Sequence, residues 1–92
     1  MYKLVFESRV AKDLKELEKN LAKQIIKRIE IHLVNSPKSV GKPLRGSLKS
    51  LWKYRYRDYR VVYQVMDETI TVLIIAIRHR KDIYEYLERW LT

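Results

Sequence analysis

Residues 51–77 read LWKYRYRDYRVVYQVMDETITVLIIAI, and this stretch decides the fold. Apolar and polar side chains alternate along much of it, which predicts β-strands, because successive residues of a strand point to opposite faces of a sheet. Polar breaks at residues 57–58 and 67–68 predict the two turns of a three-strand meander. Residues 69–77 are apolar at nearly every position, which predicts a central strand that is covered on both faces.

The N-terminal third of the chain predicts one strand and two helices. Residues 2–6 alternate in the manner of a short strand. Apolar residues then recur at helical spacing over residues 10–33, with a break expected near Asn20, so we expect an antiparallel helical hairpin. The hairpin should end before Pro37, because proline disfavours the helical conformation in the residue that precedes it.

The remaining segments complete an α+β fold. Residues 36–50 contain both glycines and both prolines, which predicts a loop. A helix is expected from Arg80 onward, with Ile83 and Leu87 on its apolar side. The predicted order is β-α-α-β-β-β-α, an antiparallel-rich sheet packed with the helical hairpin and the C-terminal helix. A chain of 92 residues should form one domain, residues 1–92.

Composition excludes several classes of protein. The hydrophobic share of 47% is enough for a core, and the absence of cysteine excludes disulfide scaffolds, thiol nucleophiles and the common zinc modules. No apolar run approaches the roughly 20 residues of a membrane helix, and the N-terminus does not resemble a signal peptide. We therefore expect a cytoplasmic protein without a membrane partner.

The positive charge is concentrated in one segment. The net charge is +9, and residues 36–60 carry eight lysines and arginines with Asp58 as their only carboxylate. Such a block is typical of a protein that binds a polyanion. Nucleic acid is the leading class of partner and an acidic protein the second, while a surface that serves solubility is the plainest alternative.

The first predicted strand of the meander places its cations on one face. Lys53, Arg55 and Arg57 alternate, so their side chains should leave one face roughly 7 Å apart, and the turn should bring Arg60 beside them. This face could be only the solvent side of the sheet, although such surfaces usually mix acidic residues with the cations. The opposite face should pack in the core, and it consists of Trp52, Tyr54 and Tyr56.

A further cluster, Arg78-His79-Arg80, lies where the last strand should end. If the helix begins near Arg80, Tyr84 lies one turn on and shares its face. His79 could shuttle a proton, although a lone histidine is more often a surface or capping residue.

The sequence offers no metal or cofactor site. Its two histidines lie far apart, no pair of carboxylates converges, and there is neither a phosphate-binding glycine loop nor a Ser-His-Asp arrangement. What remains is cofactor-free and metal-free chemistry by Lys, Arg and Tyr on a polyanion. For RNA, this means attack of a 2′-hydroxyl on the neighbouring phosphate, helped by a base, by cations and by an acid for the leaving oxygen.

Four motifs together resemble the RelE branch of the RelE/ParE toxin superfamily. They are GKPLRG at residues 41–46, LWKYR at 51–55, DYRVVY at 58–63 and RHRKDIY at 78–84, and the resemblance covers essentially the whole chain in order. It implies the toxin of a type II toxin–antitoxin pair that cleaves mRNA in the ribosomal A site and leaves a 2′,3′-cyclic phosphate. It also implies an acidic, RelB-like antitoxin as partner, besides the ribosome and mRNA, with operator DNA bound only through the toxin–antitoxin complex.

The same resemblance implies roles for individual residues. Lys53 and Arg55 match a basic catalytic pair, and Lys53 is the better candidate base because a guanidinium almost never deprotonates. Tyr84 and His79 compete with Lys53 for that role, while Tyr84 also matches a residue that positions the ribose or stacks on a base. The catalytic set that the resemblance implies is Lys53, Arg55, Arg60, Arg80 and Tyr84. The expected RNA-binding set is Arg45, Lys49, Arg57 and His79.

Two rival functions follow from the same sequence. ParE-type relatives inhibit DNA gyrase and generally lack the full cationic set, so the presence of that set argues against this function. The second rival is a non-catalytic module that uses its basic face only to bind RNA or protein.

Overall fold

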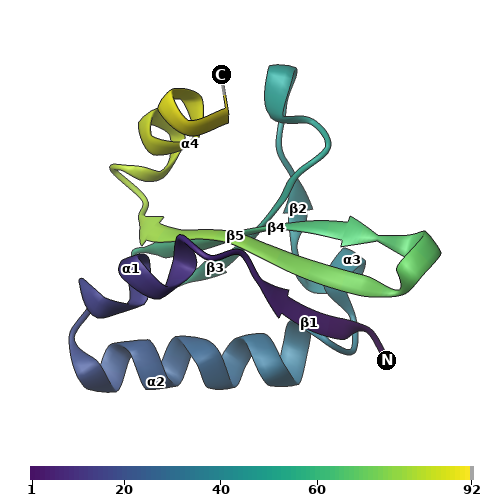
Figure 1. The fold of residues 1–92 in the computed structure, drawn as a ribbon, viewed down its shortest axis with the longest axis horizontal. Coiled ribbons are helices and arrows are strands. Elements are labelled where there is room, and N and C mark those ends of the chain that lie inside the picture. The colour runs from purple at the N-terminus through teal and green to yellow at the C-terminus, as the bar shows by residue number, and fades with distance from the viewer. Residues whose placement is uncertain (92) are drawn as a thin grey trace.

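The structure, a computed structural model, describes residues 1–91 and has a five-stranded sheet at its centre (Figure 1). Neighbouring strands pair antiparallel, except that the N-terminal strand pairs in parallel with the longest one. The order across the sheet is β1 (Lys3–Phe6), β5 (Thr71–His79), β4 (Tyr59–Met66), β3 (Trp52–Tyr56) and β2 (Lys42–Pro43).

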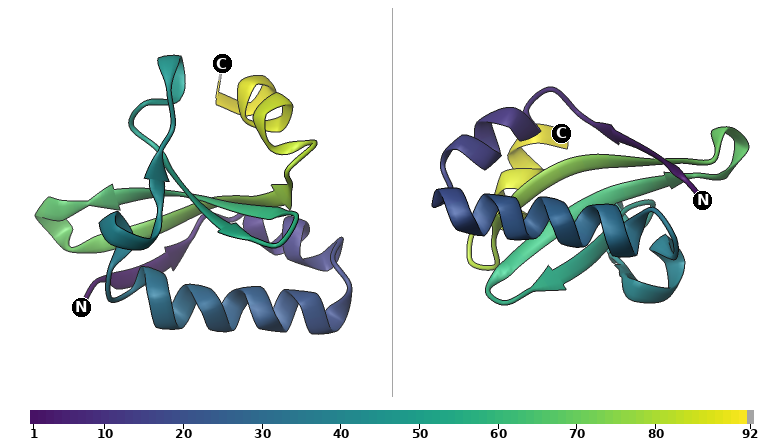
Figure 2. Two further views of the ribbon diagram at one scale, coloured as in Figure 1. Left: turned by 180° about the vertical axis from the view of Figure 1, so that it is seen from behind. Right: turned by 90° about the horizontal axis from the view of Figure 1, so that it is seen from below.

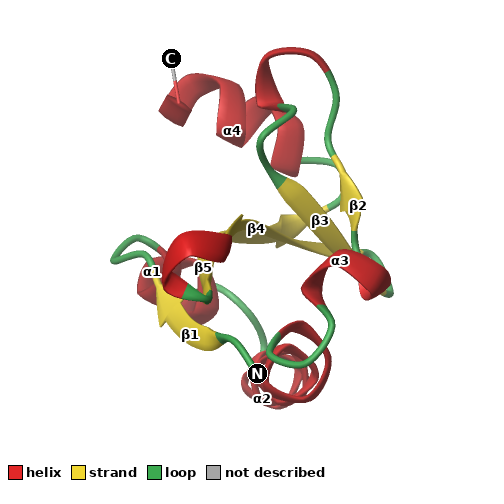
Figure 3. Ribbon diagram, turned by 90° about the vertical axis from the view of Figure 1, so that its right-hand side faces the viewer, coloured by secondary structure: helices red, strands yellow, loops and turns green. Residues whose placement is uncertain are grey.

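Helices cover the two faces of the sheet (Figures 2 and 3). One side carries α1 (Val10–Lys15) and α2 (Lys19–Arg28), which continues as a π-helical turn over Ile29–Leu33. The other side carries α4 (Ile83–Leu91) and the loop between β2 and β3. The short elements are α3 (Pro37–Val40) and two 3-10 turns, Gly46–Leu48 and Asp67–Thr69.

Each helical layer packs on its own apolar cluster. On the α2 side, Ile25, Ile29 and Leu33 are fully buried against the sheet, as the helical spacing of the sequence predicts. On the α4 side, Ile83 and Leu87 pack on the opposite sheet face. The strand between these clusters, β5, is buried on both faces, and this confirms the prediction from its continuous apolar sequence.

The predicted α+β class and the meander with its two turns are confirmed, whereas two helix boundaries are wrong. The first helix ends at Lys15, and the next begins at Lys19 rather than after a break near Asn20. The Glu18 carboxylate sets this start, because it accepts hydrogen bonds from two backbone N–H groups of the new helix. The last helix begins at Ile83, not at Arg80.

The segment predicted as a loop contains regular structure that positions β3. The hydroxyl of buried Tyr63, on β4, donates a 2.6 Å hydrogen bond to the carbonyl of Pro37 in this segment. This bond fixes α3 against the sheet. Gly41 follows α3, and a Cβ at this position would collide with the Tyr63 hydroxyl. The absence of a side chain at Gly41 therefore allows β2 to reach β3.

No helix within residues 1–91 has both the length and the apolar character needed to cross a lipid bilayer.

Candidate functional site

Two adjoining hollows beside β3 share Lys53, and we call them together the basic cleft. The larger has a volume of about 460 Å³ and lies between residues 43–48 and α4, where Arg45 and Tyr84 line it. The smaller, of about 230 Å³, is lined by Val40, Lys42, Lys53, Arg55 and Arg60. Four cations therefore line the smaller hollow, and Arg45 adds a fifth to the cleft.

Strand geometry produces this arrangement. Lys53 and Arg55 are two residues apart on β3, so both leave the face of the sheet that α2 does not cover. Arg55 lies directly opposite Arg60 on β4, so both side chains leave the same face of the sheet and line the smaller hollow. Within residues 1–91, none of these three cations forms a salt bridge with a carboxylate. Like charges placed opposite one another destabilise a sheet, and an anion in the cleft would relieve this repulsion.

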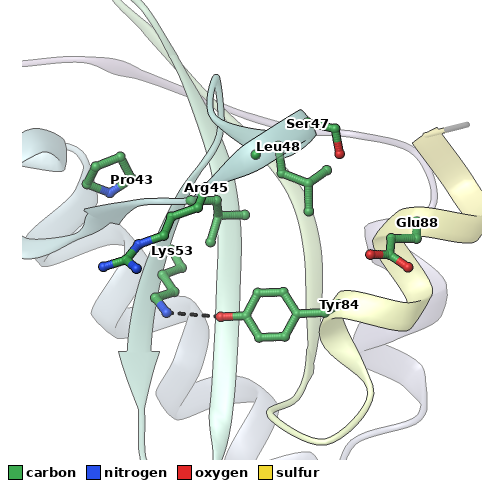
Figure 4. Close-up of a pocket in the computed structure, with 9 residues that line it drawn as sticks. Pro43, Arg45, Ser47, Leu48, Lys53, Tyr84 and Glu88 are labelled. Atoms are coloured by element: carbon green, nitrogen blue, oxygen red, sulfur yellow. Dashed lines mark hydrogen bonds between the residues drawn. The ribbon is translucent and has the colours of Figure 1, made fainter.

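Lys53 and Tyr84 are joined by a hydrogen bond across the larger hollow (Figure 4). The Lys53 ammonium donates to the Tyr84 hydroxyl at 2.9 Å, and the two side chains point toward one another from β3 and α4. Tyr84 is 43% exposed, so its ring and hydroxyl remain accessible from solvent. An ammonium group and a phenolic hydroxyl therefore lie together at the wall of a cationic cleft.

Arg60 and Arg80, two of the three arginines of the expected catalytic set, both contact the turn between β3 and β4. Nη1 of Arg60 donates to the carbonyls of Arg57 and Tyr59, at 3.0 and 2.9 Å, which fixes its guanidinium at the turn. Arg80 lies on the other side of the same turn, where its backbone N–H donates to the Asp58 carbonyl at 2.7 Å. Its Nε is 3.6 Å from an Asp58 carboxylate oxygen, an exposed ion pair that a phosphate could displace at little cost.

Arg78 holds α4, the helix that carries Tyr84. Its guanidinium lies 3.9 Å from the Tyr86 ring centroid and 3.2 Å from the buried carboxylate of Asp13 on α1. The same carboxylate accepts a hydrogen bond from the Ile77 N–H at 3.0 Å. Burial raises the pKa of the Asp13 carboxyl, and the Ile77 N–H and Arg78 oppose that rise. This contact between α1 and α4 therefore helps to determine where Tyr84 lies.

The basic cleft contains five of the residues expected from the sequence, namely Arg45, Lys53, Arg55, Arg60 and Tyr84. Arg80 is not part of its lining, but it contacts the turn at which Arg60 is fixed. The expected reason for the position of Tyr84 is wrong. Arg80 precedes α4, so the two residues do not share a helix face, and it is the hydrogen bond to Lys53 that positions the tyrosine.

Three expected RNA-binding residues lie elsewhere. Arg57 does not continue the row of Lys53 and Arg55, because β3 ends at Tyr56 and Arg57 adopts a left-handed conformation with φ of 53°. His79 pairs with Tyr59 in the sheet and so faces away from Arg60, and its Nδ1 accepts a hydrogen bond from the Lys81 N–H. Lys49 follows a 3-10 turn and lines neither hollow of the cleft.

The sequence did not single out two residues of this region, Lys42 and Asp58. Lys42 lines the smaller hollow because β2 pairs it with Lys53, and its place in the basic segment was the available signal. Asp58 was visible as the one carboxylate of that segment, but its pairing with Arg80 depends on tertiary structure. Among residues 1–91, no three His, Cys, Asp or Glu side chains gather as metal ligands do.

Comparison with known proteins identifies the class of this fold and site. A family model described as the ParE toxin of the parDE type II toxin–antitoxin system matches residues 4–84. In the structure of the RelBE2 toxin–antitoxin complex of Mycobacterium tuberculosis, a chain superposes with a TM-score of 0.81 at 31% identity, over 85% of this chain and 90% of that one. The isolated RelE toxin of Escherichia coli superposes with a TM-score of 0.72 at 29% identity, over 100% of both chains. The chain therefore belongs to the ParE toxin family of type II toxin–antitoxin systems.

Within that family it is a RelE-like toxin. Toxin RelG of Mycobacterium tuberculosis is 34% identical over 83 residues, which cover 90% of this chain and 95% of the relative. The mRNA interferase toxin RelE of Escherichia coli is 32% identical over 87 residues, which cover 90% of both.

Proposed function

We propose that this RelE-like toxin is a metal-independent endoribonuclease that cuts mRNA in the ribosomal A site and so inhibits translation. The observation that carries the proposal is the basic cleft itself, where Lys53 is hydrogen-bonded to Tyr84 beside two arginines that form no salt bridge within residues 1–91. Relatives at 32% identity bear the name mRNA interferase, which supports the same activity.

The proposed reaction is attack of a 2′-oxygen on the adjacent phosphorus. A base removes the proton from the 2′-hydroxyl, the new P–O bond forms, and the bond to the 5′-oxygen of the next nucleotide breaks. That oxygen takes a proton from the protonated base or from water and leaves as a 5′-hydroxyl, while the upstream fragment keeps a 2′,3′-cyclic phosphate. Charge builds up on the phosphate oxygens during the reaction, and fixed cations stabilise it because they need no reorganisation.

We assign the steps to groups by their position. Lys53 is the proposed base, and Tyr84 is the alternative because the two share one hydrogen bond. Arg55 and Arg60 hold the phosphate oxygens, since both line the smaller hollow. Arg80 leaves Asp58 and stabilises the phosphate or the leaving oxygen. His79 is a poor third choice as base because its ring faces away from Arg60.

The proposal includes partners and a cellular location. Two solved structures to which this chain is similar are complexes of RelE-type toxins with RelB-type antitoxins, and we propose an acidic antitoxin of that kind here. Operator DNA would then be bound only through the complex of the two proteins. Activity on ribosomes places the toxin in the cytoplasm.

Programmed ribosomes test the function directly. Ribosomes with a defined A-site codon should yield codon-specific cuts on addition of the purified toxin, without added metal. The matching family model is described as a ParE toxin. Gyrase inhibition, which the resemblance of the sequence implies for ParE-type relatives, is therefore the second candidate, and a supercoiling assay with DNA gyrase is the matched experiment. Uncut mRNA together with inhibited supercoiling would replace the proposal with that candidate. Ribosome or RNA binding without either effect would instead indicate a non-catalytic module.

Arg80→Ala separates catalysis from docking. We expect it to abolish cutting while ribosome affinity stays within about tenfold, because one phosphate contact among many supplies a modest share of the affinity. Arg89→Ala, at an exposed arginine of α4 that lines neither hollow of the cleft, is the control and should cut normally. If Arg80→Ala weakens binding and cutting by the same large factor, Arg80 is a docking contact.

A further inference from the structure

A second cationic hollow lies on the opposite face of the β3–β4 hairpin. It has a volume of about 490 Å³ and opens between α2 and the turn at which the hairpin reverses. We call it the α2 hollow. Its lining consists of Gln24, Lys27, Arg28, Ile31, His32, Tyr56 and Arg57.

An aromatic ring organises the cations of the α2 hollow. The guanidinium carbons of Arg28 and Arg57 each lie 5.3 Å from the centroid of the Tyr56 ring. The Tyr56 hydroxyl donates a 2.7 Å hydrogen bond to the Gln24 side chain, which fixes the ring. Cations held beside an aromatic ring keep their N–H donors free, because the contact is made through the ring face.

These cations have no anionic partner among the residues that the structure describes. Within residues 1–91, neither Lys27, Arg28 nor Arg57 forms a salt bridge. Three unpaired cations around one hollow repel one another, and folding alone does not require them. An anion bound between them removes this repulsion, and guanidinium groups match phosphate oxygens with paired donors.

We propose that the α2 hollow binds the sugar–phosphate backbone of RNA at a site separate from the basic cleft. The proposal rests on the proposed function only in taking RNA as the polyanion. One turn carries a cation of each site, since Arg60 donates to the Arg57 carbonyl while the Arg57 side chain lies on the far face. A folded RNA that passes around this turn contacts both sites. The α2 hollow binds without cutting, because no lysine–tyrosine hydrogen bond like that of Lys53 and Tyr84 is present among its lining residues.

The lining favours nucleic acid over an acidic protein segment. Protein partners anchor themselves with apolar side chains in desolvated pockets. The α2 hollow offers one aliphatic side chain, Ile31, among cations, an amide, an imidazole and a ring. This composition suits phosphate oxygens and ribose, which need charge and hydrogen bonds more than apolar area.

The double variant Arg28→Gln/Arg57→Gly tests the proposal in the full chain. Glutamine keeps the helix propensity of arginine, and glycine accepts the positive φ of residue 57 without strain, so both changes spare the fold. The probe is a 2′-O-methyl RNA stem–loop, which cannot be cut because its 2′-oxygens carry methyl groups. Its Kd is measured over a series of salt concentrations.

We expect the variant to bind the stem–loop about five- to thirty-fold more weakly at about 0.1 M salt, with the slope of log K against log salt reduced by about 2. The control Lys12→Gln/Lys15→Gln removes the same charge from α1, an element that lines neither the cleft nor the α2 hollow, and should bind like the wild type. Equal losses in both variants, or none in either, would overturn the proposal. Unchanged RNA binding with weaker binding of poly-L-glutamate would overturn it in favour of an acidic protein partner.

This measurement is independent of catalysis. If the wild-type toxin fails to cut mRNA on ribosomes while the stem–loop still depends on Arg28 and Arg57, the nuclease proposal fails and the RNA site stands. If the wild-type toxin cuts mRNA while binding of the stem–loop does not depend on either residue, the nuclease proposal stands and the proposed RNA site fails.

Discussion

The two faces of β3 differ in burial and in charge. On one face, Tyr54 is buried in the larger apolar cluster, and Trp52 and Tyr56 pack against that cluster. On the other face, Lys53 and Arg55 line an open cleft and have no salt bridge within residues 1–91. One face therefore contributes to stability, whereas the other keeps like charges close together, a repulsion that a bound anion would relieve.

The elements that lie over each face of β3 explain how one strand has both a buried aromatic face and an open cationic face. The helix α2 and its π-helical extension cover the aromatic face, and α4 lies on the other side of the sheet (Figure 3). On the cationic face, the larger hollow lies between α4 and residues 43–48. Substitutions on the cationic face should therefore lower activity more than stability, and substitutions on the buried face should lower stability more than activity. The predictions below use this separation.

The largest effect should come from two neighbouring residues of β4 that face opposite sides. Arg60→Ala should lower kcat/KM for mRNA cutting by about 10²–10³-fold, the cost of removing one preorganised charge-stabilising group. Its unfolding free energy should fall by at most about 1 kcal/mol, because the lost hydrogen bonds lie at the turn between β3 and β4 and are partly exposed to solvent. Val61→Ala, at a fully buried position, should lower the unfolding free energy by about 1–3 kcal/mol and leave the folded enzyme active. Urea titrations and cleavage assays measure the four values, and similar effects on both properties would contradict the separation.

Gly41→Ala should disturb both faces at once. The added Cβ collides with the Tyr63 hydroxyl and lies 2.9 Å from the Lys53 carbonyl oxygen, so the buried bond from Tyr63 to Pro37 must break. We expect a loss of about 2–3 kcal/mol in unfolding free energy, together with lower activity because the backbone at Lys53 shifts. Adding Tyr63→Phe removes the colliding oxygen and should recover part of the stability. A stable Gly41→Ala single variant would show that α3 moves freely.

The smallest effect should appear in the pH dependence of stability. Burial raises the pKa of the Asp13 carboxyl above its ordinary 3.8, so the folded state holds this proton more tightly than the unfolded state does. The contribution is therefore fully present below pH 3.8 and is lost as the pH rises through the folded pKa. The unfolding free energy of the wild type should decline over this interval relative to that of Asp13→Asn, which does not titrate.

Asp67→Asn is the control with the opposite sign. Hydrogen bonds from Lys38 and Tyr2 lower the pKa of the Asp67 carboxyl, so its contribution is present above pH 3.8 and lost as the pH falls. Chemical denaturation at several pH values measures both differences. If the difference in unfolding free energy from the wild type changed with pH in the same direction for both variants, the opposite pKa shifts of Asp13 and Asp67 would be contradicted.

Much of the fold was predictable because it follows from local pattern. Period-two alternation gave the meander, and the continuous apolar sequence of residues 69–77 predicted the buried strand that the structure places as β5. Helix starts were not predictable from apolar spacing, because the Glu18 side chain rather than the hydrophobic pattern begins α2. The parallel pairing of β1 with β5 depends on contacts between distant segments and has no local signal.

The cleft was predictable where strand geometry decides. Lys53, Arg55 and Arg60 come together because alternation and register place them there. Arg57 was misplaced because the alternation of β3 was continued into the predicted turn at residues 57–58. Its left-handed conformation there turns the side chain to the α2 side. The α2 hollow could not be predicted from the sequence either. It combines Arg57 of this turn with cations of α2, and Arg28 lies 29 positions earlier in the chain.

The most direct test of the central claim is an analysis of RNA ends after cutting on programmed ribosomes. The account predicts a 2′,3′-cyclic phosphate on the upstream fragment, a 5′-hydroxyl on the downstream fragment, and no cut when the scissile nucleotide carries a 2′-deoxyribose. Cutting of the deoxy substrate at the normal rate, or fragments that end in a 3′-hydroxyl and a 5′-phosphate, would contradict it, because the 2′-oxygen could not then be the nucleophile.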